Sequence, residues 1–202
     1  MTPNITQHNK ARPDDAPRVA DGRRARRASE VMAALGIVQL GDPRLSAGTV
    51  PVNLAAESEE VARIVARLSA TADEVKLRHN FSPGSMGIAA PQIGVGRSVA
   101  LFRPNDNDQV VLINPRVIRY EPDDQAEWEE ESEGCLSFFD FRVWARRPRV
   151  IVVEHVSLAG EQLVTTFDKG RQARDVLHEI DHLNGVLCFD TLPSGARNIT
   201  RA

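Results

Sequence analysis

The sequence predicts an α+β fold in which mainly antiparallel β-sheets pack around a C-terminal metal-binding helix, with a further helix on the N-terminal side. Three observations support this fold class. Apolar residues recur with helical spacing in segments 57–75 and 173–183, and segment 97–167 between them contains short β-rich runs. One helix before the strands and one after them favours an α+β arrangement over alternating β-α-β units.

The N-terminal helix is expected to begin in the acidic stretch 57–60, because negative side chains in the first turn of a helix interact favourably with its dipole. Its predicted buried stripe has the spacing of one helix face and comprises Val61, Ile64, Val65, Leu68, Ala72 and Val75.

Five runs rich in β-branched and aromatic residues predict strands at 99–102, 110–114, 117–120, 150–156 and 163–167. Proline, asparagine, aspartate and glycine residues separate these runs, as expected for turns. The acidic run 127–131 is interpreted as a solvated strand or loop that could tune access to a cleft.

The C-terminal helix is predicted from a second apolar stripe, followed by Asn184 and Gly185 as a stop signal. His178 and His182 lie beside this stripe, four residues apart, so their imidazoles project from one face of the helix. Two histidines so placed can bind one metal ion, and Glu179 would then lie beside the open position of the metal.

The third metal ligand could be either of the two cysteines. Cys135 follows Gly134, where the backbone can approach another group closely, and its thiolate would complete a Cys/His/His set. Cys188 instead completes a pattern that mimics metzincin proteases. Those proteases need a methionine turn after the motif, and the chain has no methionine beyond Met86. Cys188 is therefore interpreted as a small buried apolar residue.

Three segments together resemble the peptide deformylase family. They are 86–94 (MGIAAPQIG), 133–137 (EGCLS) and 178–182 (HEIDH), in the order of the three motifs of that family. The resemblance extends from about residue 40 to about residue 192, which is most of the chain.

The resemblance implies a ligand set and a group of catalytic residues. Cys135, His178 and His182 would hold one divalent metal ion, with Fe2+ expected first and Zn2+, Ni2+ or Co2+ able to occupy the same ligands. Glu179 would be the general acid and base. Gln92 and the backbone N–H of Leu136 would form an oxyanion hole. The residues expected to contact substrate are Met86, Gly87, Glu133, Gly134, Arg142 and Asp175.

The implied activity is hydrolysis of the N-formyl group from the N-terminal methionine of newly made polypeptides, with release of formate. One alternative is an amidase that acts on another formylated or acylated amine, which Asp175 and the 138–140 loop favour. A second alternative is a metal-stabilised domain without turnover. Its hallmark would be loss of Glu179 or Gln92, and both are present.

Two ion pairs are expected around the site. Asp175 lies three residues before His178, where the family generally presents an apolar residue, so a buried carboxylate there needs a partner. Arg142 is the candidate partner. Arg147 and Asp181 also match family positions, and we expect them to pair and to fix the helix against the sheet.

Composition indicates a polar N-terminal tail over residues 1–28, expected to be disordered, followed by a single catalytic domain over 29–202. A net charge of −3 predicts neither nucleic-acid nor membrane binding. We expect a bacterial cytoplasmic protein whose partners are N-formylated nascent polypeptides, with the ribosome as a candidate place of action. Acidic residues interrupt the basic tail, which disfavours organelle targeting. The oligomeric state is left undetermined.

Overall fold

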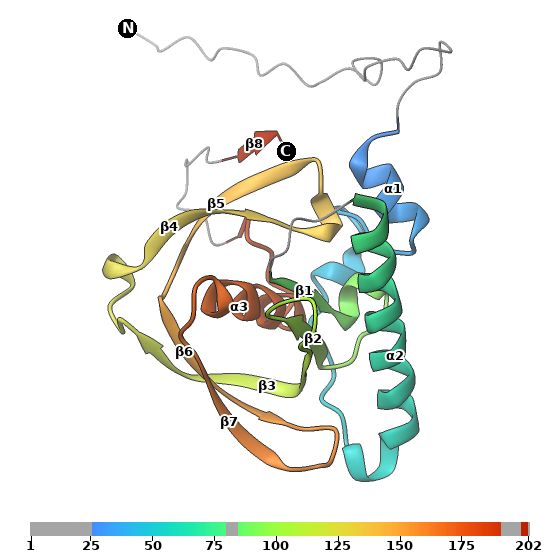
Figure 1. Ribbon diagram of the computed structural model, residues 1–202, viewed down its shortest axis with the longest axis vertical. Helices are drawn as coiled ribbons and strands as arrows, with labels where there is room; N and C mark the ends of the chain where they lie inside the picture. Colours follow the sequence, from blue (N-terminus) through green and yellow to red (C-terminus); the bar gives the residue numbers. More distant parts are fainter. Residues whose placement is uncertain (1–25, 80–84, 191–198, 202) are drawn as a thin grey trace, which may run out of the picture.

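The computed structural model describes residues 26–79 and 85–190 and the backbone of 199–201. Two helices precede the strands and one follows them, except for a short last strand (Figure 1). The elements in chain order are α1 (Ala28–Ala34), α2 (Leu54–His79), β1 (Met86–Ala89), β2 (Val99–Arg103), β3 (Val110–Glu121), β4 (Glu129–Gly134), β5 (Phe141–Arg147), β6 (Val150–Val156), β7 (Gln162–Phe167), α3 (Gln172–Leu183) and β8 (Ile199–Arg201).

The strands form two antiparallel sheets, as the predicted fold class requires. One sheet has the order β1-β2-β3-β6-β7 and the other has the order β4-β5-β8. The runs predicted at 110–114 and 117–120 are two parts of the single strand β3. The predicted α+β class with antiparallel sheets around a C-terminal helix is confirmed.

Helix α3 lies between the two sheets, and α2 covers the outer face of the sheet at β1 and β2 (Figure 1). Alternation along β1 explains this arrangement, because successive side chains of a strand point to opposite faces. Ile88 belongs to the core that includes the buried stripe of α2, whereas Ala89 belongs to the core of α3. Leu101 and Phe102 divide between the two cores in the same way.

The predicted stop of the C-terminal helix is confirmed. Asn184 caps α3, and Gly185 follows with a φ of +73°, a conformation that side-chain-bearing residues rarely adopt. A Cβ at this position would lie 2.6 Å from the backbone nitrogen of Gly48. The turn after α3 therefore needs glycine for both its torsion angle and its close packing.

The predicted polar tail falls almost entirely outside the described residues, so its disorder and the domain boundary at 28/29 stay predictions. Within the described part, α1 already begins at Ala28. No helix in the described ranges has the length and apolar character needed to cross a membrane.

Candidate metal centre and active site

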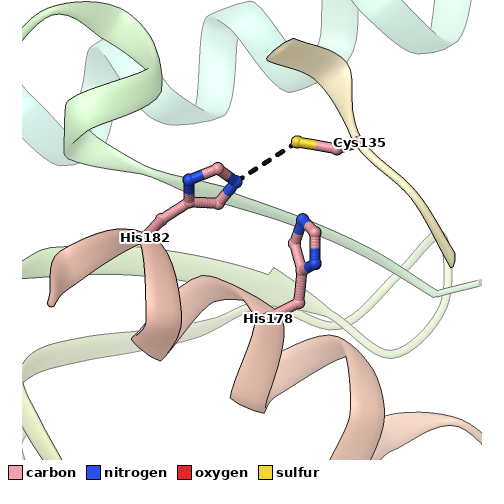
Figure 2. A group of neighbouring side chains, drawn as sticks. All are labelled: Cys135, His178 and His182. Atoms are coloured by element: carbon pink, nitrogen blue, oxygen red, sulfur yellow. Dashed lines mark hydrogen bonds between the residues drawn. The ribbon is translucent and has the colours of Figure 1, made fainter. Parts of the chain in front are cut away.

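Two histidines from α3 and a cysteine that follows β4 converge at one point (Figure 2). Ligand atoms of Cys135, His178 and His182 all lie within 4.8 Å of one another. The Cys135 Sγ lies 3.2 Å from Nε2 of His182. All three residues are buried. The helix supplies two ligands through its four-residue spacing, and the second sheet brings the third.

Two imidazole nitrogens in this group, His178 Nε2 and His182 Nδ1, are buried without a hydrogen-bond partner among the described residues, and the one on His178 faces the other ligands. His178 Nδ1 lies 3.2 Å from Oε2 of Glu133, whereas Nε2 of the same ring is buried with no hydrogen-bond partner among the described residues. An unsatisfied buried polar atom costs stability, and a metal ion at Nε2 would remove that cost. One thiolate and two imidazoles are donors that suit a divalent late first-row ion. The residues therefore fit a metal site.

Cys188 also lies near His178, in a second group with Glu133 whose ligand atoms are all within 4.8 Å. Burial raises the pKa of the Cys188 thiol to about 12, which makes the thiolate needed for metal binding costly to form. Cys188 is 1% exposed and belongs to a small apolar cluster with Phe138 and Val143. Its predicted character as a buried apolar residue is confirmed.

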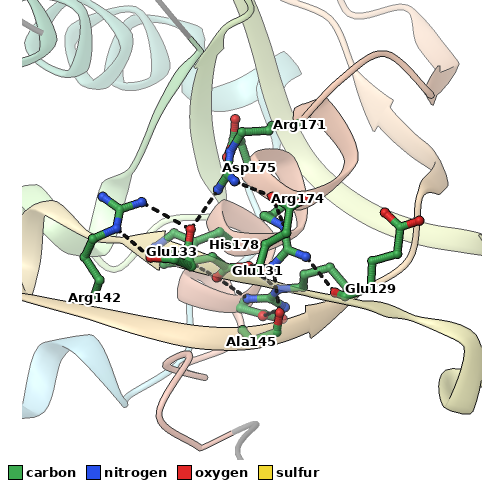
Figure 3. Close-up of polar contacts among 12 residues, drawn as sticks. Glu129, Glu131, Glu133, Arg142, Ala145, Arg171, Arg174, Asp175 and His178 are labelled. Carbon is green, nitrogen blue, oxygen red and sulfur yellow. Dashed lines mark hydrogen bonds and ion pairs between the residues drawn. The ribbon is translucent and has the colours of Figure 1, made fainter. Parts of the chain in front are cut away.

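The carboxylate of Glu133 is the centre of a buried ion network behind His178 (Figure 3). It accepts hydrogen bonds from Arg147 Nε at 2.8 Å and Nη2 at 3.1 Å, and from Arg174 Nη1 at 2.8 Å. Burial alone would raise the pKa of Glu133, but His178 and Arg147 outweigh it and hold the pKa well below its usual range. Glu133 is thus a permanent carboxylate whose position orients His178.

The predicted pairing of Arg147 with Asp181 is confirmed, with Nη1 and Oδ2 2.5 Å apart. Arg147 lies on β5 and Asp181 on α3, so the pair joins the helix to the second sheet. The carboxylates around Arg147 keep the pKa of its guanidinium above the usual value despite burial.

Asp181→Asn is expected to lower the free energy of unfolding by about 1 to 3 kcal/mol, because a buried arginine loses one of its two carboxylates while Glu133 remains. Asp123→Asn, the same change at an exposed turn residue, is the control and should have almost no effect. Urea unfolding of both variants measures the difference. Equal stability of Asp181→Asn and the parent would show that the pair contributes nothing.

Arg174 is a member of the site that the sequence analysis missed. Its guanidinium binds Glu133, the Ala145 carbonyl at 2.8 Å and the Glu129 carbonyl at 2.7 Å. It therefore ties α3 to both β4 and β5. The sequence could have predicted this role, because Arg174 lies one helical turn before His178 on the ligand face and next to the buried Ala173.

Glu179 is buried on the side of α3 that faces β1. It is 3% exposed, and its Oε2 has no partner among the described residues. A Cβ at position 87 would lie 2.6 Å from Cγ of Glu179, so only glycine lets the strand pass this closely. In the protein without metal, burial raises the pKa of Glu179 to about 8.

The raised pKa of Glu179 predicts a pH-dependent stability of the metal-free protein. Between the ordinary pKa of 4.5 and about 8, the unfolded chain releases a proton that the folded chain retains. Raising the pH through this window therefore favours unfolding, by at most about 4 to 5 kcal/mol. Glu179→Gln should flatten this dependence in urea unfolding between pH 5 and 8. Parallel curves for the variant and the parent would contradict the assignment.

Gln92 and Leu136 both lie next to Cys135. Gln92 accepts a hydrogen bond from the Ala89 N–H at 2.8 Å, which points its amide nitrogen towards Cys135 Sγ and Ser137 Oγ, each 3.4 Å away. Leu136 is the first residue of a 3-10 turn, Leu136–Phe138, and N–H groups at such a start lack earlier carbonyls to bind. The Gln92 amide and the Leu136 N–H therefore both lie next to the Cys135 sulfur, and the Gln92 amide donates to it.

The predicted pairing of Arg142 with Asp175 is wrong. Arg142 donates to Ser132 Oγ at 2.6 Å and to the Ser132 carbonyl at 3.1 Å. Arg142 is opposite Gly134 in the β4–β5 pair, so its side chain reaches Ser132 on the neighbouring strand. Asp175 instead accepts a hydrogen bond from Ser85 Oγ. It also lies 3.9 Å, Oδ1 to Nε, from Arg171.

The other expected substrate-contact residues are spread around the centre. Met86 and Gly87 begin the strand that passes Glu179, and Gly134 immediately precedes Cys135. Asp140 of the 138–140 loop accepts a hydrogen bond from the Ser29 N–H at 3.1 Å, so this loop is held against α1. No substrate contact of these residues is tested by the structure, and these assignments stay predictions.

Comparisons with known proteins agree on one family. The family described as polypeptide deformylase matches residues 34–198. A peptide deformylase of Desulforudis audaxviator is 34% identical over 159 residues, which cover 79% of this chain and 94% of that relative.

Two solved structures extend this likeness to the fold. The structure of a class I type b peptide deformylase from Acinetobacter baumannii with Met-Ala-Ser bound matches with a TM-score of 0.64 and 29% identity, over 77% of this chain and 96% of that chain. The peptide deformylase of Thermotoga maritima matches with a TM-score of 0.62 and 31% identity, over 78% and 96%.

Proposed function

This chain belongs to the polypeptide deformylase family, and from that premise we propose that its buried Cys135–His178–His182 centre removes the N-formyl group from the N-termini of newly made polypeptides and releases formate. The observation that carries the proposal is the unpartnered Nε2 of His178, which faces two further metal-ligating side chains and has Glu179 as its neighbour on the helix.

Cys135, His178 and His182 would hold one divalent metal ion, with Fe2+ as the proposed ion and Zn2+, Ni2+ or Co2+ as ions that suit the same donors. When bound, such an ion lowers the pKa of a water molecule from about 15.7 towards about 7 and polarises the formyl carbonyl. The protein contributes the orientation of the ligands. Glu133, held by Arg147 and Arg174, keeps His178 turned so that Nε2 is the nitrogen left for the metal.

Glu179 is the proposed proton carrier. A formyl amide is a poor electrophile and its nitrogen is a poor leaving group, so the reaction needs a group that removes a proton from water and returns it to the departing amine. Glu179 has one carboxylate oxygen without a partner among the described residues and a pKa raised to about 8 by burial. The unpartnered oxygen can therefore accept a proton from water and pass it to the departing amine.

Gln92 and Leu136 are proposed to stabilise the negative charge that develops on the formyl oxygen. The Gln92 amide is held by Ala89, so it is oriented before the reaction begins and costs little reorganisation. Removing one such donor typically raises the barrier by about 2.7 to 4 kcal/mol.

The substrate is proposed to lie along β1. This strand is at the edge of its sheet among the described strands, and an extended peptide can add to such an edge by backbone hydrogen bonds. Met86 and Gly87 would contact the peptide there, and Gly134 would border it from the other sheet. The Met-Ala-Ser tripeptide in the Acinetobacter baumannii relative supports binding of a peptide N-terminus. Nascent chains would place the reaction in the bacterial cytoplasm, near the ribosome.

A domain without turnover is a weaker candidate, because Glu179 and Gln92 are both present and both lie beside the metal-ligating group. The amidase that acts on another formylated amine is favoured by one specific observation, the carboxylate of Asp175 beside His178.

The proposed function is tested by formate release from formyl-Met-Ala-Ser, with protein purified anaerobically and its metal content measured. We expect formate in proportion to the fraction of protein that carries metal, and loss of activity after removal of the metal with a chelator. Fully metal-loaded protein that releases no formate would refute the function.

A further inference from the structure

Four polar residues, Ser85, Glu131, Arg171 and Asp175, are linked beside His178, and we call them the polar wall. Figure 3 shows Glu131, Arg171 and Asp175 next to His178. Arg171 and Asp175 lie seven and three residues before His178, so the helix presents them on its ligand face. Ser85 comes from the segment just before β1, and Glu131 comes from β4.

The polar wall borders β1, the strand to which the substrate is proposed to bind. Ser85 is two residues before Gly87, which packs against Glu179, and its hydroxyl bridges to Asp175 on α3. Asp175 thus lies at the junction between the strand proposed to bind the peptide and the helix that carries the ligands. The first side chain of a peptide held there would lie next to this carboxylate.

The donors of the polar wall and its neighbours are already used by the protein. Arg171 donates through Nη1 to Glu131 and through Nη2 to the Ser132 carbonyl at 3.2 Å. Arg142 donates to the same carbonyl. Arg174 donates hydrogen bonds to Glu133 and to two backbone carbonyls. These guanidinium groups are therefore held by the protein's own acceptors.

Asp175, by contrast, has acceptor capacity to spare. A carboxylate offers about four lone-pair sites. Among the described residues Asp175 accepts one hydrogen bond, from Ser85, and the 3.9 Å separation from Arg171 is too long for another. Its side chain is 19% exposed, so solvent satisfies the remainder until a ligand replaces it. The group that complements this wall is a hydrogen-bond donor.

We propose that the enzyme prefers formylated N-termini whose first side chain carries a hydrogen-bond donor, such as an amide or an ammonium group, and that Asp175 receives this donor. The proposal rests on the proposed deformylation. A methionine side chain would displace water from Asp175 without forming new hydrogen bonds to the carboxylate. A side chain with an N–H donor would replace the hydrogen bonds that the water made.

The test compares kcat/KM for formate release from matched pairs of formyl tripeptides. Formyl-Gln-Ala-Ser is paired with formyl-Met-Ala-Ser, and formyl-Lys-Ala-Ser with its formyl-norleucine counterpart, which lacks only the ammonium group. We expect the donor-bearing member of each pair to react at least about 10-fold faster, since a hydrogen bond to a charged group gives a factor of about 10 to 100. This comparison uses the parent protein and does not depend on a variant that folds.

Asp175→Val should reverse both preferences, and Asp175→Asn should weaken the lysine preference more than the glutamine preference, because it removes the charge and retains a carbonyl acceptor. Asp123→Val, at an exposed turn, is the control and should leave both ratios unchanged. Calorimetry of the products Gln-Ala-Ser and Met-Ala-Ser gives a readout without turnover, and the parent should bind the glutamine product more tightly.

Faster turnover of formyl-Met and formyl-norleucine in the parent would overturn the preference while leaving deformylation established. Ratios that are the same in Asp175→Val and the parent would overturn the role of Asp175. Absence of formate from all four peptides with metal-loaded protein would instead refute the proposed function, and the inference with it.

Discussion

Cys135→Ala is expected to weaken metal binding by more than about 100-fold and to abolish most formate release. Loss of a partner that only orients a metal ligand typically costs about 10- to 100-fold in affinity, and Cys135 would supply one of only three protein bonds. Metal titration in the presence of a competing chelator measures the affinity directly, without reference to turnover.

Cys188→Ala is the matched control for that experiment. The two cysteines share one apolar cluster, so both substitutions remove a sulfur from the same region of the core. Cys188→Ala should cost stability of the order of 1 kcal/mol for the small cavity but leave the metal content unchanged. Equal loss of metal in both variants, or loss only in Cys188→Ala, would show that the ligand set is different.

Glu179→Gln is expected to retain the metal ion and to lose about 100-fold or more of kcat, because the amide preserves the shape of the side chain but cannot accept the proton from water. Glu179 is not among the metal-ligating group, so its substitution should leave metal content intact. Metal analysis and formate release on the same preparation separate the two effects.

The measurement also separates proton transfer from substrate binding. If Glu179 acts only in proton transfer, kcat should fall while KM changes little. An active Glu179→Gln enzyme, or one that has lost its metal, would contradict the proposed role. Asp123→Asn again serves as a control that changes an exposed carboxylate only.

Spacing along the chain was enough to predict the helical half of the site. The apolar stripe of α3, the two ligand histidines and the stop at Gly185 all follow from local periodicity and the conformational freedom of glycine. The same reasoning predicted most of α2 and the strands with apolar runs.

The second sheet was harder to predict, because its pattern is not simply apolar. In β5 every second residue is buried, at Val143, Ala145 and Arg147. Because a charged arginine occupies one of these buried positions, the sequence does not show the usual alternation of apolar and polar residues. In β4 the buried position is Glu133, just after the acidic run 127–131 that was interpreted as a solvated strand or loop. Burial of these charges depends on partners far along the chain, which the local pattern does not reveal.

The sequence by itself determined which residue types could form this site: two histidines on one helix face, a glutamate between them and two candidate cysteines. Only the tertiary structure showed that Cys135 lies next to the histidines and that Glu133 is buried between two arginines. It also showed that Asp175 accepts a hydrogen bond from Ser85 and does not pair with Arg142. The reason is physical. Neighbours within a helix are set by its 3.6-residue turn, whereas contacts between a helix and a distant hairpin depend on strand register and on how each buried charge is satisfied.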